Sequence, residues 1–352
     1  MIRYFNFHGL ITLSVEGSKE KIDYLCKQCD YFEAYHVEGK VDIRVVCDKF
    51  TSILDSNEKC MFINRKYYVT KDKLYAEDRY KTASWKLQLE NLDADDTTTL
   101  YFDGNSWTKY ILHKAFIESL IRYKLNRLGY FMVHSSSVGI EGKGVVFPAS
   151  PEAGKTSTML NYLEEGGSFM SDDFSLIGKG KVLAYPTPIT LHSHNLKRHP
   201  YLMNILSSKE ISEIKKRTFV LYATFGMGDI SYKVDIWNKL SGDSVAKELP
   251  LGNFIMLTKY TGDNIETKEI TRFDFIEKLL IVNYFETTIF DSYQRAYHCV
   301  NIISAEDEFW NRMRSNAENI ILDDTYIELC IPQNYSANTF EAIQTIVKSQ
   351  MG

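Results

Sequence analysis

Lys155 and Thr156 close a short loop whose residues are suited to holding phosphate groups. The loop reads Ala149-Ser-Pro-Glu-Ala-Gly154-Lys155-Thr156 and matches the phosphate-loop pattern, with alanine in place of the usual first glycine. In that pattern, backbone amides surround a polyphosphate, the lysine reaches its β- and γ-phosphates, and the hydroxyl holds Mg²⁺. We therefore expect a nucleotide site made of Ala149, Ser150, Pro151, Glu152, Ala153, Gly154, Lys155, Thr156 and Ser157.

Two acidic residues, Asp172 and Asp173, follow this loop at a spacing that suits phosphoryl transfer. The reaction needs a phosphate cradle, a metal ligand and a group that orients the attacking hydroxyl. One carboxylate can bind Mg²⁺ while the other takes the proton of the acceptor. The alternative is that the pair only caps the next turn, but the loop upstream favours the chemical interpretation.

The neighbouring segments predict the elements that must position these residues. Val145-Val146-Phe147 indicates a buried strand feeding the loop, and a helical pattern follows Lys155 and stops at Gly166-Gly167. Strand, loop and helix in this order direct loop amides and a helix N-terminus at a phosphate. A second strand over 168–171, if parallel to the first, would deliver both aspartates to the same edge of the sheet.

The segment from His134 to Asp173 resembles the catalytic domain of HPr kinase/phosphorylase. It has a histidine in a strand, a hairpin about Glu141-Gly142-Lys143, the loop, and the Asp pair after the following helix. The order is also similar to that of the related kinases found with lasso-peptide clusters, which phosphorylate a peptide serine. The resemblance implies an α/β P-loop kinase domain of HPr-kinase type that uses ATP and Mg²⁺.

The same resemblance implies roles for individual residues. His134 would position or activate the acceptor near the γ-phosphate, Asp172 would be the catalytic base, and Asp173 would assist Thr156 with the metal. From its own surroundings, His134 could equally be a structural histidine of a strand. The Arg-Gly-rich segment that HPr kinases carry after the Asp pair is not found in this sequence, so the resemblance does not identify HPr as the acceptor.

The loop also departs from the usual pattern. Glu152 stands where a glycine is typical, and Pro151 has no N–H to donate. A carboxylate beside a phosphate site is unfavourable unless it points away or meets a cation. Additional positive charge on the phosphates could come from an arginine, for which the sequence offers three candidates, Arg217, Arg272 and Arg295.

Other histidines and cysteines invite a metal or redox interpretation. His192, His194 and His199 lie close together, but no acidic or cysteine ligand completes a zinc pattern. A basic loop facing phosphate or substrate, with Lys197 and Arg198, and a solvated loop are the alternatives. The Cys26–Cys29 CxxC motif has no second ligand pair, so we expect ordinary thiols there.

Composition bounds the class of protein. The chain has 352 residues, of which 44% are hydrophobic and 25% charged, as in a globular protein with room for two domains. The net charge of −5 gives no general attraction to nucleic acid or anionic membranes. Since no apolar run is long enough to span a bilayer and no leader pattern is evident, the cytoplasm is the expected location.

The chain as a whole reads as two domains. Residues 1–105 predict a β-rich N-terminal domain, and residues 106–352 the HPr-kinase-like P-loop kinase domain. We expect a kinase that transfers the γ-phosphoryl of ATP to a hydroxyl, most readily a serine of a peptide or small protein, with a homo-oligomer possible. The alternatives are a small-molecule hydroxyl kinase and a non-catalytic module that senses ATP.

Overall fold

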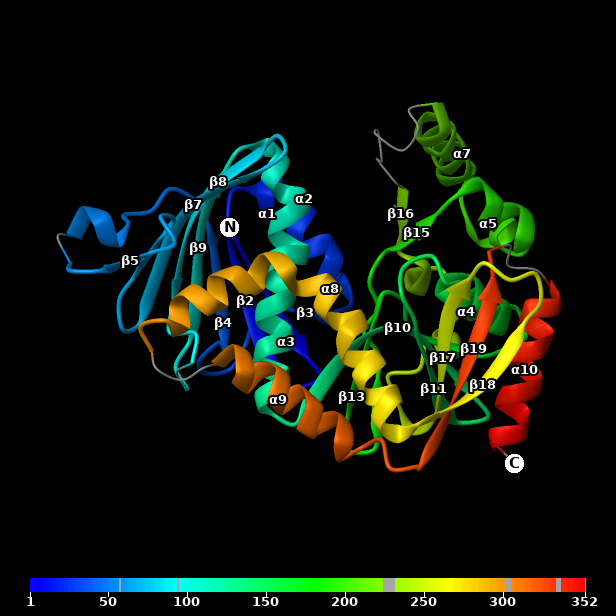
Figure 1. Ribbon diagram of the computed structural model, residues 1–352. Coiled ribbons are helices and arrows are strands. Elements are labelled where there is room, and N and C mark those ends of the chain that lie inside the picture. Colours follow the sequence, from blue (N-terminus) through cyan, green and yellow to red (C-terminus); the bar gives the residue numbers. More distant parts are fainter. Residues whose placement is uncertain (57, 94, 224–231, 302–304, 334–336, 352) are drawn as a thin grey trace. The chain divides into compact units, whose positions relative to one another are not determined.

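The computed structural model describes residues 1–56, 58–93, 95–223, 232–301, 305–333 and 337–351 (Figure 1). The chain divides into two compact units, one made of Met1–Phe131 and Tyr284–Ala317 and the other of Met132–Asn283 and Glu318–Gly352. This division differs from the boundary predicted near residue 105, because residues 106–131 and 284–317 pack with the N-terminal segment. Both units contain a large sheet with helices, so the fold is mixed α/β.

The first unit is built on a nine-stranded sheet, in keeping with its many aromatic and β-branched residues. The strands follow the order β3-β1-β2-β4-β9-β8-β7-β6-β5. They are parallel at β2–β4 and β4–β9 and antiparallel at the other pairings. Their bounds are β1 Ile2–Phe7, β2 Ile11–Gly17, β3 Glu33–Ala34, β4 Ile43–Cys47, β5 Met61–Ile63, β6 Tyr67–Val69, β7 Lys73–Tyr80, β8 Ala83–Glu90 and β9 Thr98–Gly104.

A helical segment covers this sheet where the apolar spacing of residues 110–128 predicts one. Its parts are α2 (Lys109–Ile111), a π-helical stretch (Leu112–Ile117) and α3 (Glu118–Arg127). Phe116 packs against Trp85 of β8 and against Tyr293 of α8 (Arg272–His298). The unit also holds α1 (Lys19–Cys26), most of α9 (Ala305–Glu318), and 3₁₀ turns at Lys27–Phe32, Ile53–Ser56 and Ser106–Thr108.

The second unit contains an eight-stranded sheet. Its main path is β11-β10-β13-β14-β17-β19-β18, with β12 paired to β10 and a further pairing between β11 and β17. β11, β17 and β19 are parallel neighbours. The bounds are β10 Tyr130–Ile140, β11 Lys143–Pro148, β12 Ser168–Ser171, β13 Phe174–Gly178, β14 Lys181–Leu183, β17 Glu248–Tyr260, β18 Glu266–Thr271 and β19 Thr325–Pro332.

Helices cover both faces of the parallel strands. On one face, α4 (Lys155–Glu164) and α10 (Ala337–Met351) share a buried core with β11, β17 and β19, and the rings of Tyr162 and Phe340 meet at 5.0 Å. On the other face, Phe254 of β17 packs against Phe275 of α8. Because neighbouring strand residues point to opposite faces, Phe254 and the buried Ile255 serve different layers. Figure 1 shows α4 and α10 beside these strands.

A smaller substructure follows β14 in the same unit. It consists of a two-stranded sheet, β15 (Ile189–Leu191) with β16 (Tyr232–Val234), and of α5 (Ser193–Arg198), α6 (Leu202–Ile205) and α7 (Ser208–Ala223). Short 3₁₀ turns follow at Ile236–Asn238 and Gly242–Ser244. In the part of the chain that the structure describes, we find no helix with the length and apolar character needed to cross a membrane.

Candidate active site

The predicted strand, loop and helix occur in the second unit in the expected order. β11 ends at Pro148, residues 149–154 form the loop, and α4 begins at Lys155. Gly154 adopts a left-handed φ of 92°, a conformation that favours glycine and turns the chain into the helix. The N-cap residue of α4 is Gly154, which has no side chain with which to cap the first amides of the helix. Such amides are suited to an anion.

The Lys155 ammonium lies buried against its own loop. It donates to the carbonyl oxygens of Ala149 (3.0 Å) and Ser150 (3.2 Å) and lies 2.8 Å from Nε2 of His134. An ammonium has three protons and no acceptor, and these three partners account for them. The positive charge is therefore held at the loop opening by neutral acceptors.

Asp172 meets the first turn of α4. β12 pairs antiparallel with β10, as does β11, so β11 and β12 run in the same direction and end at the same edge. There Thr156 Oγ1 donates to the two carboxylate oxygens of Asp172, at 3.1 and 3.0 Å. Burial raises the pKa of Asp172 to about 6, and the charge of Asp173 adds to the rise, while Lys155 and Thr156 oppose it.

Asp173 lies next to His134 instead. Its Oδ1 is 3.3 Å from His134 Nδ1, and its side chain is 43% exposed whereas that of His134 is buried. Asp173 has a φ of 79°, in the left-handed region that aspartate adopts more readily than most other non-glycine residues. The backbone N–H of His134 donates to the Asn283 amide oxygen, which fixes the strand at this position.

The hairpin brings His134 to the loop. β10 and β11 pair through Ile140–Lys143, and the two turn residues Glu141 and Gly142 both have positive φ, as the tightest hairpin turns require. We expected Ile140 to face Gly144; the observed register is shifted by one residue because the turn has two residues rather than three. The backbone carbonyl oxygen of His134 consequently accepts a hydrogen bond from the N–H of Ala149, at the start of the loop.

The unusual loop residues are accommodated at its outer side. Glu152 is highly exposed (83% for its side chain), and its carboxylate lies 3.8 Å from the Lys259 ammonium. Pro151 is exposed as well. Glu152 thus meets a cation instead of facing the loop amides uncompensated, which is the condition under which a carboxylate is compatible with a phosphate site.

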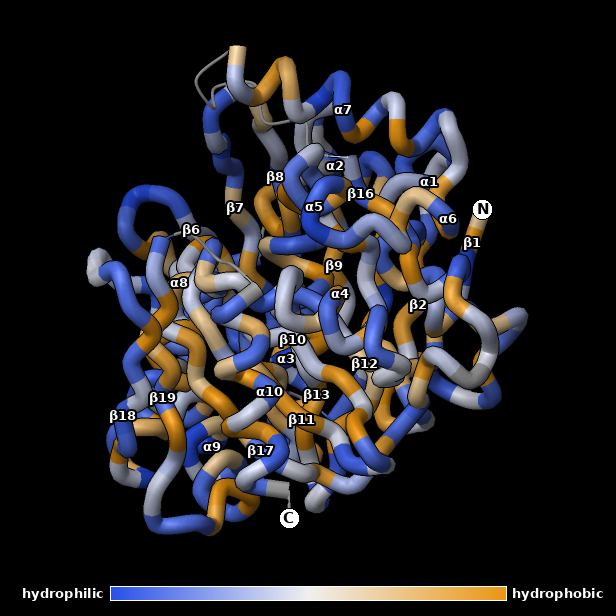
Figure 2. Tube along the Cα trace, turned by 90° about the vertical axis from the view of Figure 1, so that its right-hand side faces the viewer, coloured by the Kyte–Doolittle hydropathy of each residue, from blue (hydrophilic) through white to orange (hydrophobic). Residues whose placement is uncertain are grey.

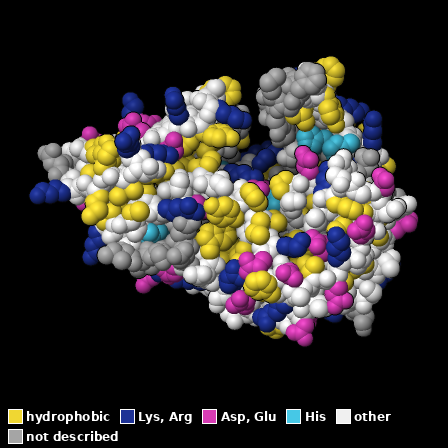
Figure 3. Space-filling view, in the orientation of Figure 1, with side chains coloured by type: hydrophobic (Ala, Val, Ile, Leu, Met, Phe, Trp, Pro, Cys, Tyr) yellow, Lys and Arg dark blue, Asp and Glu magenta, His cyan; other side chains and the backbone are white. Residues whose placement is uncertain are grey.

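A cavity of about 620 Å³ opens in front of the loop. Its walls come from the loop and α4, from α5 and α7, and from the ends of β17 and β19. The lining residues are Glu152, Gly154, Lys155, Thr156, Ser157, Thr190, His192, His194, Asn195, Arg198, Leu221, Tyr222, Lys259 and Gln333. In Figure 3, histidine side chains appear on the surface over α5 beside hydrophobic side chains over α7.

The lining includes residues that sequence reasoning did not single out for this site. Lys259 lies one residue before the end of β17, and Gln333 directly follows β19. Because both strands run parallel to the strand that feeds the loop, their carboxyl ends reach the same edge. The pairing of strands was the missing information. Arg198, for which we left a ligand-facing and a solvated loop open, is the last residue of the helix α5 and lines the cavity.

The three arginines proposed as phosphate clamps lie elsewhere among the described contacts. Arg217 pairs with Glu213 at 3.3 Å and stacks over Tyr232. Arg272 donates to the carbonyl of Glu318. Arg295 belongs to the first unit and donates to the hydroxyl of Tyr284. Arg198 is the arginine that lines the cavity.

The cysteine pair shows no sign of redox chemistry. Cys26 and Cys29 are buried free thiols, and burial raises the pKa of Cys26 to about 12. A thiol of raised pKa is a poor nucleophile. Within the described residues, no cluster of three or more histidine, cysteine or acidic side chains is arranged to hold a metal ion.

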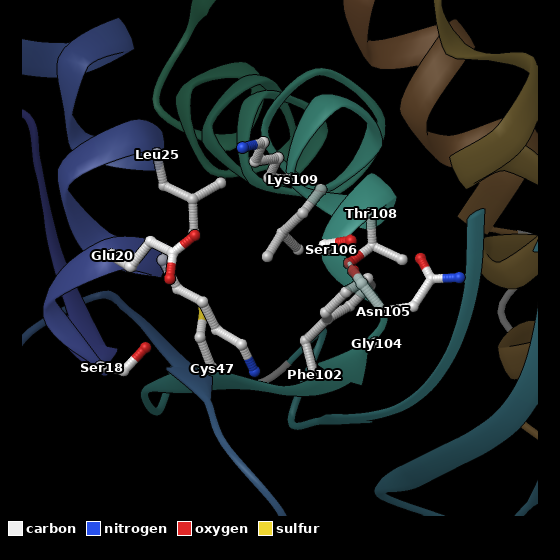
Figure 4. A pocket seen from close by; sticks show the side chains of 12 residues that line it. Ser18, Glu20, Leu25, Cys47, Phe102, Gly104, Asn105, Ser106, Thr108 and Lys109 are labelled. Atoms are coloured by element: carbon white, nitrogen blue, oxygen red, sulfur yellow. Dashed lines mark hydrogen bonds between the residues drawn. The ribbon is translucent and has the colours of Figure 1, made fainter. Parts of the chain in front are cut away.

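A second cavity, of about 210 Å³, lies in the first unit (Figure 4). It has an apolar floor that includes Leu25 and Phe102, with Glu20 and Lys109 at its edge. None of the residues predicted for the nucleotide site lines it in the described structure. The chemistry-bearing residues therefore concentrate in the second unit.

Comparisons with known proteins add little to this geometry. Neither a protein-family model nor a curated protein matches the chain. Among solved structures, the HPr(Ser) kinase/phosphatase from Coxiella burnetii is similar over 62% of this chain and 94% of its own, with 11% sequence identity and a TM-score of 0.26. This similarity is weak.

Proposed function

We propose that this chain is a Mg²⁺-dependent kinase that transfers the γ-phosphoryl group of ATP to a hydroxyl. One observation carries the proposal: His134, Lys155, Thr156, Asp172 and Asp173 come from three separate segments and contact one another in pairs beside the loop. Lys155 meets His134, His134 meets Asp173, and Thr156 meets Asp172. Phosphoryl transfer requires a phosphate-binding loop, a lysine, a metal site and a group at the acceptor. These five side chains can supply every part except the backbone amides, which come from the loop and from the first turn of α4.

The metal position is best supplied by Thr156 and Asp172. Their oxygens are 3.0–3.1 Å apart at the start of α4, and Mg²⁺ prefers oxygen ligands and typically takes only one or two from the protein, with water and phosphate completing the set. Mg²⁺ bound here would bridge the β- and γ-phosphates and neutralise their charge. This assignment gives Asp172 the metal-binding role that the sequence resemblance implied for Asp173.

The acceptor position is best supplied by His134 and Asp173. The Asp173 carboxylate, 3.3 Å from Nδ1, can fix the imidazole and stabilise its positive charge after Nε2 has accepted the hydroxyl proton. Asp172, hydrogen-bonded to Thr156 and buried, is less suited to the role of base that the resemblance implied.

The acceptor class rests on the sequence resemblance to peptide serine kinases. A serine in a peptide or small protein is therefore the acceptor we propose, ahead of a small-molecule alcohol. The loss of loop glycines favours a second candidate, a module that binds ATP without transferring phosphate. The retained Lys155, Thr156 and Asp pair favour catalysis.

A transfer experiment separates these possibilities. The full chain is incubated with Mg²⁺ and ATP labelled in the γ-phosphate. Each reaction also contains glycerol and one of two degenerate peptide pools, which differ only in a fixed serine or alanine. We expect label in the serine pool alone. Label on glycerol but on neither pool would indicate a small-molecule kinase. ATP binding without transfer to any acceptor would refute the kinase proposal.

A further inference from the structure

We infer that α5 and α7 form the nucleoside side of the site, with the ring of His194 as the surface on which the base stacks. The inference rests on the proposed function, since it assigns the part of ATP that the loop itself does not hold. It concerns the cavity of about 620 Å³, a volume in the range of cavities that enclose a small organic ligand.

The predicted phosphate site forms one wall of this cavity. Gly154, Lys155, Thr156 and Ser157 form the wall where α4 begins. Of the described residues that line the cavity, none is His134 or Asp173, the pair assigned to the acceptor. A nucleotide whose phosphates lie on the loop would thus extend its nucleoside toward α5 and α7, while the acceptor approaches from the side of His134.

Two histidines form a stacked pair on that wall. The rings of His192 and His194 lie 5.5 Å apart at an interplanar angle of 20°. His192 is the N-cap of α5, and its side chain and that of Asn195 bond reciprocally to each other's backbone, so its ring is fixed before any ligand arrives. His194 is the more exposed ring of the pair. A ring held in place by its neighbour loses little freedom when it binds a ligand.

The chemistry of this wall suits a base rather than further phosphate. Burial and the charges of His192 and Arg198 lower the pKa of His194, so its ring is uncharged at neutral pH and can stack on a heterocycle. Tyr222 adds a second aromatic side chain from α7, whose hydrophobic residues alternate with hydrophilic ones in Figure 2. Thr190 and Gln333 offer hydrogen-bonding groups for the edge of the base.

Two basic side chains also line the cavity, Arg198 at the end of α5 and Lys259 near the end of β17. Arg198 and Lys259 line the cavity together with the loop residue Glu152, which pairs with Lys259. A nucleoside between the histidine pair and the ends of β17 and β19 would keep its phosphates near these charges. Inorganic tripolyphosphate, by contrast, would occupy the loop without reaching His194.

The experiment compares these two ligands. Affinities for Mg²⁺-bound ATP and for Mg²⁺-bound tripolyphosphate are measured by calorimetry on the full chain and on three variants. His194→Ala removes the ring, His194→Phe keeps a ring, and His36→Ala removes an exposed histidine of the first unit as a matched control. Thermal unfolding of each variant establishes that it is folded.

We expect His194→Ala to weaken ATP binding about tenfold, the effect of losing roughly 1.4 kcal/mol of stacking. Tripolyphosphate affinity should be unchanged, and His194→Phe and His36→Ala should bind ATP like the wild type. Equal ATP affinity in wild type and His194→Ala would overturn the inference, as would equal losses for both ligands. If the wild type binds neither ligand, the proposed function itself fails.

Discussion

Lys155 Nζ lies 2.8 Å from His134 Nε2, and His134 Nδ1 lies 3.3 Å from Asp173 Oδ1. Because an ammonium can only donate, Nε2 is the acceptor, and a neutral imidazole then carries its proton on Nδ1, toward the carboxylate. Lys155 thus occupies the lone pair that a base would use. When nucleotide phosphates attract the ammonium, that lone pair becomes available, so nucleotide binding would prepare His134 for the acceptor.

His134→Ala should therefore slow phosphoryl transfer without removing nucleotide binding. Loss of a positioned acid–base group typically lowers the rate by about 10²–10⁴, while the loop, Lys155 and Thr156 stay in place. Single-turnover transfer to the serine peptide pool measures the rate, with ATP affinity and thermal stability recorded in parallel. His36→Ala serves as the control. A rate within a few-fold of wild type would assign His134 a structural role only.

The two aspartates should respond differently to the same substitution. Asp172→Asn removes a charge from the metal position, so half-maximal activity should require more Mg²⁺. Asp173→Asn removes the partner of His134, so the maximal rate should fall while the Mg²⁺ requirement stays the same. The measurement is initial transfer rate against Mg²⁺ concentration. The opposite pattern would restore the assignment of Asp172 as base and Asp173 as metal ligand.

The Mg²⁺ requirement should also depend on pH. Burial raises the pKa of Asp172 to about 6, and a protonated carboxyl is a poor ligand for a cation. More Mg²⁺ should therefore be needed as the pH falls through 6, and this dependence should vanish in Asp172→Asn. Mg²⁺ titrations at pH 5.5 and 8 test the point. A requirement that is the same at both pH values in the wild type would count against Asp172 as the ligand.

Asp172→Asn should stabilise the folded chain at neutral pH. The folded state holds the proton more tightly than the unfolded state, whose carboxyl has a pKa near 3.8. Folding is thus penalised as the pH rises from about 4 to 6, and the full penalty, up to about 3 kcal/mol, applies above 6. Denaturant unfolding should show this gain at pH 8 and little at pH 4. Asp263→Asn, at an exposed position away from the site, is the control. A loss of stability in Asp172→Asn at pH 8 would refute this expectation.

Local sequence patterns predicted the elements around the site well. The strand over Tyr130–Ile140 has the bounds that we expected, and the strand, loop and helix about Lys155 follow in order. Each of these elements is marked by buried apolar residues or by glycines at its ends. β8 and β9 were not predicted. Trp85–Glu90 alternates apolar and polar residues as a half-buried strand does and was overlooked, whereas Thr98–Gly104 joins polar and turn-forming residues. Both strands depend on partners across the sheet.

Relations between distant segments were beyond the reach of the sequence. The segment Arg272–His298 forms one continuous helix, α8, in whose middle the polar residues Asn283 and Thr287 are buried. The partners of the two carboxylates also depend on tertiary structure. Asp172 meets Thr156 of α4, whereas Asp173 meets His134 of β10. The two helices α5 and α7, which form part of the cavity wall, lie between β15 and β16 in the chain. The pairing of these two strands is likewise a contact between distant segments.

The central claim is that the loop before α4 holds a nucleoside triphosphate through Lys155. The most direct test is titration calorimetry of Mg²⁺-bound AMP-PNP, a non-hydrolysable ATP analogue, into the full chain and into Lys155→Met. Lys181→Met, which removes an exposed lysine of β14 paired with Glu248, is the matched control. We predict binding to the wild type and the control, and at least about tenfold weaker binding to Lys155→Met, since a buried point charge on the phosphates is lost. Equal affinity in wild type and Lys155→Met would contradict the account.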